Sequence, residues 1–456
     1  MKNASLFALL GGLAVVACGS SSSDAAPPGA TDTTPTEPPG ATPPGPAGNP
    51  MGPGADPKGP GATPPKNDPG GPSSKYPAFT PAMGQLVDNG GTVLKQPVIY
   101  TVTWVGDPKA SDLETLGDTI GTGDFWKDTV SEYGAGPATS GTAQHIRLSE
   151  PAPRQVTNDE LDAFVADKVA KGTFPAPGTG DPVYILYLPT TTSLLVGNGK
   201  NASDACKQGI GGYHANTKGG SKTTAYAIVP RCGSSFDSVT LAGSHELVEA
   251  ASDPYPSATP GWVGFRDQDL AWEFFQQFQS ENGDACEFYR DSPLDPALGY
   301  SAYTLQRSWS NKSAAAGHDP CVPAFKSAPF FNVTPLGLED ISVDLSSLYP
   351  SVGIVNTKGV QVAVGATRTI PLGFYSDAAT PPWKISARLG GPGGGAKSGV
   401  DLSLDVKEGE NGQMANLTIK VNAAGKTGTQ LITIVSTSKS GGTSHYMPIL
   451  IGSMAK

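Results

Sequence analysis

The sequence predicts an α/β or α+β domain over residues 76–325, followed by an all-β, immunoglobulin-like sandwich over residues 326–456. Two observations predict this order. Before residue 326, runs rich in β-branched and aromatic residues alternate with segments of helical periodicity. After it, seven or eight short alternating runs are separated by glycine-rich or polar turns, as is typical of a β-sandwich. A chain of 456 residues has room for both domains.

Strands of the first domain are expected where short apolar runs are bounded by turn residues. The run at 96–104 combines β-branched and aromatic side chains, and the run at 182–189 is almost wholly apolar, as in a buried strand. Two further strand candidates lie at 211–214 and 224–230. Alternation of such strands with helices favours a sheet covered by helices.

Helices are expected in two stretches between these strands. Residues 112–134 have mixed helical character, whereas residues 158–171 place several apolar side chains on one face. Thr157 or Asn158 can cap the second helix, because a side-chain oxygen there accepts hydrogen bonds from the free amides of the first turn.

The second domain shows no cluster of residues that suggests catalysis, so we expect an accessory or binding module. Its strands are expected at 360–364, 367–374, 383–389, 400–406, 415–421, 431–436 and 445–451.

The N-terminus has the pattern of an export signal. A basic start precedes an apolar run at 6–16, which is too short for a spanning helix. The run leads to an alanine before Cys18, which resembles the lipobox of bacterial lipoproteins, where the cysteine is lipidated. Gly19 after it favours the outer membrane. We expect a signal peptide at 1–17 and lipidation of Cys18; a plain secretory signal is the alternative.

Residues 18–75 are dominated by Pro, Gly and Ser and contain almost nothing apolar. Such a segment buries too little surface to offset its chain entropy, so we expect a disordered stalk. The net charge of the chain is −10 and only 16% of its residues are charged, which argues against a nucleic-acid partner. No later run is long and apolar enough to span a bilayer. The expected location is therefore exported and lipid-anchored, at the outer membrane or cell surface.

Four cysteines follow Cys18: Cys206, Cys232, Cys286 and Cys321. An even number in an exported chain predicts two disulfides, for which three pairings exist. We favour the sequential pairing, 206 with 232 and 286 with 321, because it closes two short loops. A cysteine metal site is disfavoured, since no Cys-x-x-Cys spacing occurs.

A His-Glu-x-x-Glu motif carries the chemistry that the sequence suggests. It lies on an expected helix that starts near Ser238 or Thr240 and ends at Asp253, because the following proline disfavours helix before it. His245 and Glu249 are four residues apart and so share a face, where they can ligate one metal ion. Glu246 stands beside them as a general base. This layout is that of a zinc hydrolase helix with Glu in place of the second His.

The third metal ligand is not fixed by local spacing. Asp253 is two turns beyond His245, about 12 Å along a straight helix, and serves only if the chain bends back. Asp284, Glu281 and His214 are the other candidates. We prefer Asp284, because the expected disulfide at Cys286 would hold its segment in place.

Seven segments between residues 97 and 323 form a recognisable series: 126–133, 183–186, 212–214, 245–249 with the Asp-Pro pair at 253–254, Trp262, 283–287 and 309–310. Their order resembles that of the EXORDIUM (phosphate-induced protein) family. The helix motif of that family resembles zinc metallopeptidase helices, which implies a zincin-like domain. Plant members typically have Asn at the position of Asp253, which argues against that residue as a ligand.

These expectations lead to two hypotheses of function. The first is a surface-anchored zinc metalloendopeptidase acting on a peptide or protein, with zinc-activated water, Glu246 as general base, and His214 or Tyr255 steadying the oxyanion. The second is a non-catalytic surface lipoprotein that binds a wall or matrix component. A serine hydrolase is disfavoured, because no Gly-x-Ser-x-Gly turn is evident.

Overall fold

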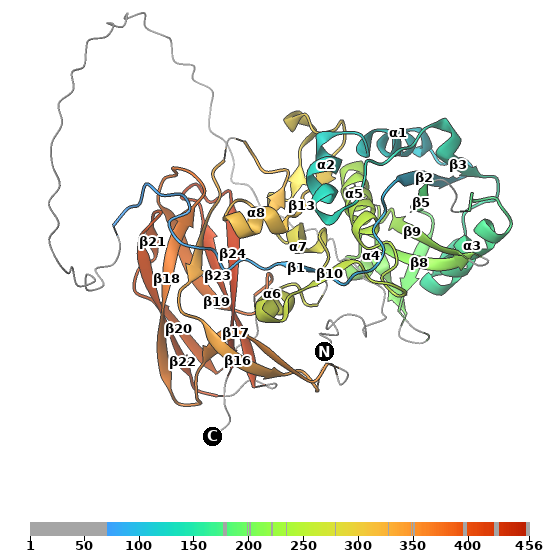
Figure 1. Cartoon of the computed structure of the whole chain (residues 1–456). Coiled ribbons are helices and arrows are strands. Elements are labelled where there is room, and N and C mark those ends of the chain that lie inside the picture. Colours follow the sequence, from blue (N-terminus) through green and yellow to red (C-terminus); the bar gives the residue numbers. More distant parts are fainter. Residues whose placement is uncertain are drawn as a thin grey trace, which may run out of the picture. The chain divides into compact units, whose positions relative to one another are not determined.

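The computed structural model describes residues 71–176, 180–197, 199, 202–219, 222–233, 235–278, 280–326, 328–347, 349, 352–394, 399–423 and 428–452 (Figure 1). All of them belong to one compact unit. The expected signal peptide, the lipidated Cys18 and the stalk before residue 71 lie outside the described residues.

The first domain is built on a five-stranded mixed sheet with strand order β3-β2-β5-β9-β8. The pairs β2–β3, β2–β5 and β5–β9 are parallel, and the edge strand β8 is antiparallel to β9. The strands are β2 (Pro97–Trp104), β3 (His145–Leu148), β5 (Asp181–Leu188), β8 (Tyr213–Gly219) and β9 (Lys222–Pro230). All four expected strands are present, but the run at 211–214 proves to be only the start of β8.

Helices cover both faces of this sheet. On one face, Val183 and Ile185 of β5 belong to a core shared with helices α1, α2 and α5. On the other, Tyr184 and Leu186 belong to a core shared with helix α3. This alternation is the period-two pattern of a strand buried on both sides. The helices are α1 (Ala110–Ile120), α2 (Asp124–Val130), α3 (Asn158–Ala170) and α5 (Phe236–Ser252).

The ends of these helices follow from their capping residues. Of the two expected caps, Thr157 takes the position at the start of α3 and forms a capping box with Glu160. Helix α5 starts at Phe236, earlier than the expected start near Ser238 or Thr240. Ser235 caps it there, because its side chain accepts a hydrogen bond from the amide of Ser238. Among the described residues, no helix is both long and apolar enough to cross a membrane.

Short elements fill the rest of the first domain and lead to the second. Both expected disulfides are present: Cys206–Cys232, and Cys286–Cys321, which joins α7 to β14. The short elements are β1 (Leu86–Asp88), β4 (Gln155–Thr157), β6 (Ser193–Val196), β7 (Ser203–Asp204), α4 (Ala205–Gln208), β10 (Trp262–Phe265), α6 (Leu270–Phe275), α7 (Asp284–Glu287), β11 (Pro293–Leu294), β12 (Leu305–Gln306), β13 (Ser308–Trp309), α8 (Asn311–Ala316) and β14 (Cys321–Val322).

The second domain is a β-sandwich, as expected, of one four-stranded sheet (β15-β18-β22-β20) and one six-stranded sheet (β16-β17-β24-β23-β19-β21). Its described residues form more strands than the seven or eight expected: β15 (Phe331–Pro335), β16 (Glu339–Asp344), β17 (Ile354–Gln361), β18 (Thr367–Ser376), β19 (Trp383–Leu389), β20 (Val400–Leu404), β21 (Glu408–Gly409), β22 (Met414–Val421), β23 (Thr429–Thr437) and β24 (Ser444–Gly452).

Candidate metal centre

Helix α5 supplies three side chains to a buried polar cluster next to the sheet. His245, Glu246 and Glu249 are fully buried, with no exposed surface. The segment that carries α7 approaches this helix very closely at Gly283, where a Cβ atom would lie 2.7 Å from Oε1 of Glu249 and 3.0 Å from ring atoms of His245. Only glycine permits this approach, so the residue at 283 helps to bring the following Asp284 to the helix.

The three expected metal ligands lie together. His245 Nε2 is 3.0 Å from Glu249 Oε1 and 3.6 Å from Asp284 Oδ1, and all three ligand atoms lie within 4.8 Å of one another. Neither His245 Nε2 nor Asp284 Oδ1 has a hydrogen-bond partner. Three atoms that face one another closely without hydrogen bonds between them are arranged as ligands of a common cation would be.

Backbone amides orient two of these carboxylates. The amide of Asp284 donates to Glu249 Oε1 at 3.0 Å, and the amide of Glu281 donates to Asp284 Oδ2 at 3.1 Å. The disulfide Cys286–Cys321 fixes α7 directly after Asp284. Such contacts around a ligand hold it in position for metal binding.

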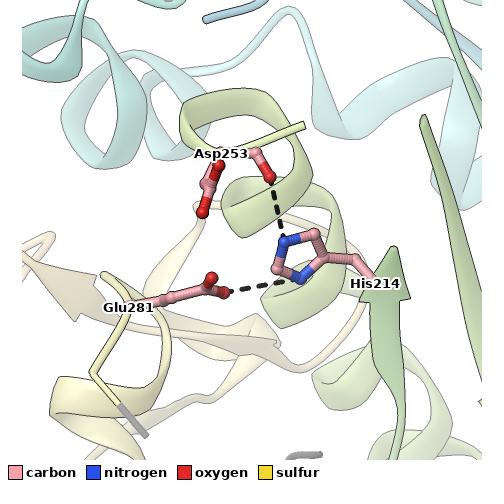
Figure 2. Close-up of side chains that lie close together, drawn as sticks. All are labelled: His214, Asp253 and Glu281. Atoms are coloured by element: carbon pink, nitrogen blue, oxygen red, sulfur yellow. Dashed lines mark hydrogen bonds and ion pairs between the residues drawn. The ribbon is translucent and has the colours of Figure 1, made fainter. Parts of the chain in front are cut away.

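His214 enters the same cluster from strand β8, as Figure 2 shows. Its Nε2 lies 3.0 Å from the backbone carbonyl oxygen of Asp253. Its Nδ1 faces three carboxylate oxygens: Glu249 Oε2 at 3.4 Å, Glu281 Oε2 at 3.5 Å and Glu246 Oε2 at 3.8 Å. None of these three contacts has hydrogen-bond geometry. The expected role of His214 at an oxyanion thus remains a prediction, while its surroundings are those of a ligand.

Asp253 stands at the end of α5, where its backbone amide donates to the carbonyl oxygen of Glu249 at 2.7 Å. Its Oδ1 accepts from the amide of Gly261 at 2.8 Å, and its Oδ2 has no hydrogen-bond partner. The carboxylate lies with the side chains of His214 and Glu281 (Figure 2), whose possible ligand atoms are within 4.8 Å of one another. Asp253 therefore belongs to the His214 side of the cluster, and its backbone forms the end of α5.

The cluster carries an excess of negative charge. Five carboxylates are buried in it, with at most 2% exposure, against two imidazoles. Among the described residues, the ion pairs of these carboxylates are made with His214 and His245, and none with Lys or Arg. Buried charges require a partner, and a metal cation is one that would suit this set. The five carboxylates are Glu246, Glu249, Asp253, Glu281 and Asp284.

The titration of the carboxylates reflects this crowding. Burial raises the pKa of Glu246 to about 7, and it raises the pKa of Glu281 well above its usual range. Burial and the neighbouring Glu249 raise the pKa of Asp284. For Glu249 burial also acts to raise the pKa, but the imidazoles of His245 and His214 outweigh it and hold the value well below the usual range.

The imidazoles respond in the opposite sense. Burial alone would lower the pKa of His214 and of His245, but the carboxylates around each ring outweigh burial and raise both values well above the usual range. The cluster thus favours additional positive charge, which either protons or metal ions can supply.

Sequence reasoning named most of this cluster but missed Glu287. Its Oε2 is buried without a hydrogen-bond partner, although the residue as a whole is only half-buried. Burial raises its pKa well above the usual range, with the charge of Asp284 acting in the same direction. The signal was present in the chain, because Glu281, Asp284 and Glu287 recur at intervals of three residues.

No protein-family model matches the chain, and no curated protein matches it significantly. Solved structures similar to it include a chimeric titin Z1Z2 carrying a decorin peptide (18% identity, 28% of this chain, 99% of that chain, TM-score 0.16). Another is an SrpA adhesin mutant from Streptococcus sanguinis (12% identity, 29% of this chain, 61% of that chain, TM-score 0.19). TM-scores this low carry no argument about function. The β-sandwich rests on the strand pairing of this chain itself.

Proposed function

We propose that the protein is a zinc-dependent hydrolase in which His245, Glu249 and Asp284 bind the ion and Glu246 is the general base. The observation that carries this proposal is the buried group of three ligand atoms within 4.8 Å of one another. Among the described residues, no Lys or Arg pairs with the carboxylates of the cluster. The peptidase reaction and a peptide or protein substrate are proposed from the resemblance of the α5 motif to zinc metallopeptidase helices.

The donor set suits zinc. One imidazole nitrogen and two carboxylate oxygens are among the ligands that catalytic zinc sites use. With bonds of about 2.0–2.2 Å in a tetrahedral site, neighbouring ligand atoms lie about 3.3–3.6 Å apart. The distances from His245 Nε2, 3.0 Å to Glu249 Oε1 and 3.6 Å to Asp284 Oδ1, are close to that spacing.

A bound zinc ion would supply Lewis acidity at this site. Glu246 would accept the proton of the attacking water and pass it to the leaving amine. Both of its carboxylate oxygens lack hydrogen-bond partners, so neither is committed to another group. Without a cation, burial raises the pKa of Glu246 to about 7. A dication nearby favours the ionised carboxylate, which is the form that accepts a proton.

The test is to purify the full chain without chelators, to measure zinc by mass spectrometry, and to assay cleavage of a quenched fluorescent peptide library. Glu246→Gln should retain zinc and lose at least about 100-fold in kcat, the usual contribution of a general base. Glu408→Gln, at the surface of the sandwich, is the matched control and should resemble the wild type. Less than a tenth of an equivalent of zinc contradicts the metal site. Undiminished cleavage by Glu246→Gln contradicts only the role of that residue.

A second candidate function is a non-catalytic surface protein that binds a wall or matrix component, with the ion in a structural role. It is favoured by the enclosure of the cluster, because structural zinc sites are closed whereas catalytic sites keep an open position. His214, His245, Glu246 and Glu249 have no exposed surface. Bound zinc whose removal lowers the melting temperature, together with no cleavage of any library peptide, would decide for this candidate.

A further inference from the structure

Glu249 faces the two buried histidines with different oxygens. Its Oε1 lies 3.0 Å from His245 Nε2, and its Oε2 lies 3.4 Å from His214 Nδ1. A carboxylate placed in this way between two nitrogen ligands has the arrangement of a bridging ligand, with one oxygen for each of two cations. The ligand set already described accounts for Oε1 only.

The tautomer of His214 follows from its contact with Asp253. A carbonyl oxygen can only accept, so Nε2 of His214 must donate to the backbone carbonyl of Asp253 at 3.0 Å. In the neutral ring this leaves a lone pair on Nδ1, which is directed into the cluster. A backbone carbonyl that holds one nitrogen of a ligating histidine is a common support of metal sites. The side chain is fully buried, and its Nδ1 has no hydrogen-bond partner.

The oxygens that face His214 Nδ1 stand at the spacing of metal ligands rather than of hydrogen bonds. Glu249 Oε2 and Glu281 Oε2 are 3.4 Å and 3.5 Å away, beyond the roughly 2.7–3.2 Å of a hydrogen bond between nitrogen and oxygen. Each of these two distances matches the separation of about 3.3–3.6 Å between a nitrogen and an oxygen ligand in a tetrahedral site with bonds of about 2.0–2.2 Å. Both oxygens lack hydrogen-bond partners.

We propose that the centre binds a second divalent cation through His214 Nδ1, Glu281 Oε2 and Glu249 Oε2, so that Glu249 bridges two ions. The proposal rests on the first site only through the shared Glu249. Two dications bring four positive charges to the five buried carboxylates of the cluster. One nitrogen and two oxygen ligands suit a first-row divalent ion such as Zn²⁺ or Mn²⁺.

The experiment is a metal titration of the full chain, first stripped with a chelator and then loaded with ZnCl₂, with bound zinc measured by mass spectrometry. The wild type should bind two equivalents. His214→Ala and Glu281→Gln should each bind one, and the second variant keeps the shape of the side chain so that the fold is preserved. His318→Ala, whose side chain is 57% exposed, is the control and should bind two. Loading with Mn²⁺ should give the paramagnetic resonance spectrum of a spin-coupled pair, which two separate ions do not give.

The outcomes separate this proposal from the proposed function. One equivalent in the wild type that persists in both His214→Ala and Glu281→Gln overturns the second site and leaves the site at His245 intact. Two equivalents with an uncoupled Mn²⁺ spectrum overturn the bridging role of Glu249. Binding of no metal by a folded wild-type chain overturns the second site together with the metal site of the proposed function.

Discussion

The backbone amide of Asp284 donates to Oε1 of Glu249 at 3.0 Å and thereby joins α7 to α5. The two residues are 35 positions apart in the chain. Each carries a carboxylate directed at His245, so the position of one ligand depends on the position of the other.

Replacing Asp284 should therefore weaken the first metal site without unfolding the domain. Asp284→Asn keeps the size of the side chain but removes the charge that an ion needs, so we expect zinc affinity to fall at least about 10-fold, or about 1.4 kcal/mol. Competition with a coloured chelator measures this change. Asp340→Asn is the control, because its carboxylate is 81% exposed on the sandwich; equal affinities of the two variants would refute the assignment.

The two disulfides should differ in their effect on the metal. Replacing Cys286 and Cys321 with Ser opens the loop that ends at α7, and should cost about 2–4 kcal/mol in the free energy of unfolding and weaken zinc binding. Replacing Cys206 and Cys232 should cost a similar free energy but leave zinc affinity closer to that of the wild type, because that bridge does not hold α7. Chemical unfolding and zinc competition measure both quantities. If replacing Cys206 and Cys232 weakened zinc binding more than replacing Cys286 and Cys321, the Cys286–Cys321 disulfide would not be what holds Asp284 in place.

Glu273 should make the protein less stable as the pH rises. Burial raises its pKa from 4.5 to about 8, although the amide of Phe265 and the hydroxyl of Ser280 both donate to it. The folded state therefore holds a proton that the unfolded chain releases above pH 4.5. Its contribution is fully present below that pH and is lost as the pH rises towards 8.

The matched variant is Glu273→Gln, an uncharged analogue whose amide can hydrogen-bond to Ser280. The difference in unfolding free energy between variant and wild type should grow in favour of the variant between pH 5 and pH 8. It should reach on the order of 4 kcal/mol at most. Urea unfolding at both pH values measures it. A difference that does not change with pH would contradict the burial of a protonated Glu273.

Lipidation of Cys18 is a prediction from the sequence, and it is tested in a bacterial host with an outer membrane. The full chain should incorporate labelled palmitate and sediment with membranes, whereas Cys18→Ala should do neither. Cys206→Ser is the control for the loss of a cysteine. Labelling that survives Cys18→Ala would point to a plain secretory signal instead.

The parts of the site that were predictable from the sequence are local. The positions of His245, Glu246 and Glu249 follow from helical spacing, because four residues make about one turn. The pairing of cysteines followed from the preference for short loops. In the sandwich, most strands were visible because apolar residues alternate with polar ones.

The remaining features depend on contacts between distant segments. His214 and Asp253 are 39 residues apart, and no local spacing predicts their hydrogen bond. The full length of β8 was missed because the polar residues at 216–218 hide an edge strand that pairs on one side only. Strand β16 was missed because only Ile341 and Val343 are buried in a run of acidic and polar residues. The sharing of Glu249 between two histidines became visible only when its two oxygens were placed.

The bridge between Cys286 and Cys321 ties the state of the site to the redox conditions around the chain. Both cysteines are buried, and Cys286 belongs to α7, the helix that carries Asp284. Thiols stay reduced in the bacterial cytoplasm and oxidise after export. In a newly made chain the disulfide would not yet hold α7 in place. The site would then bind zinc more weakly, because Asp284 would not be fixed as a ligand. If the chain is exported, as its N-terminal sequence predicts, oxidation outside the cytoplasm would complete that ligand set, and the precursor inside the cell would bind little zinc.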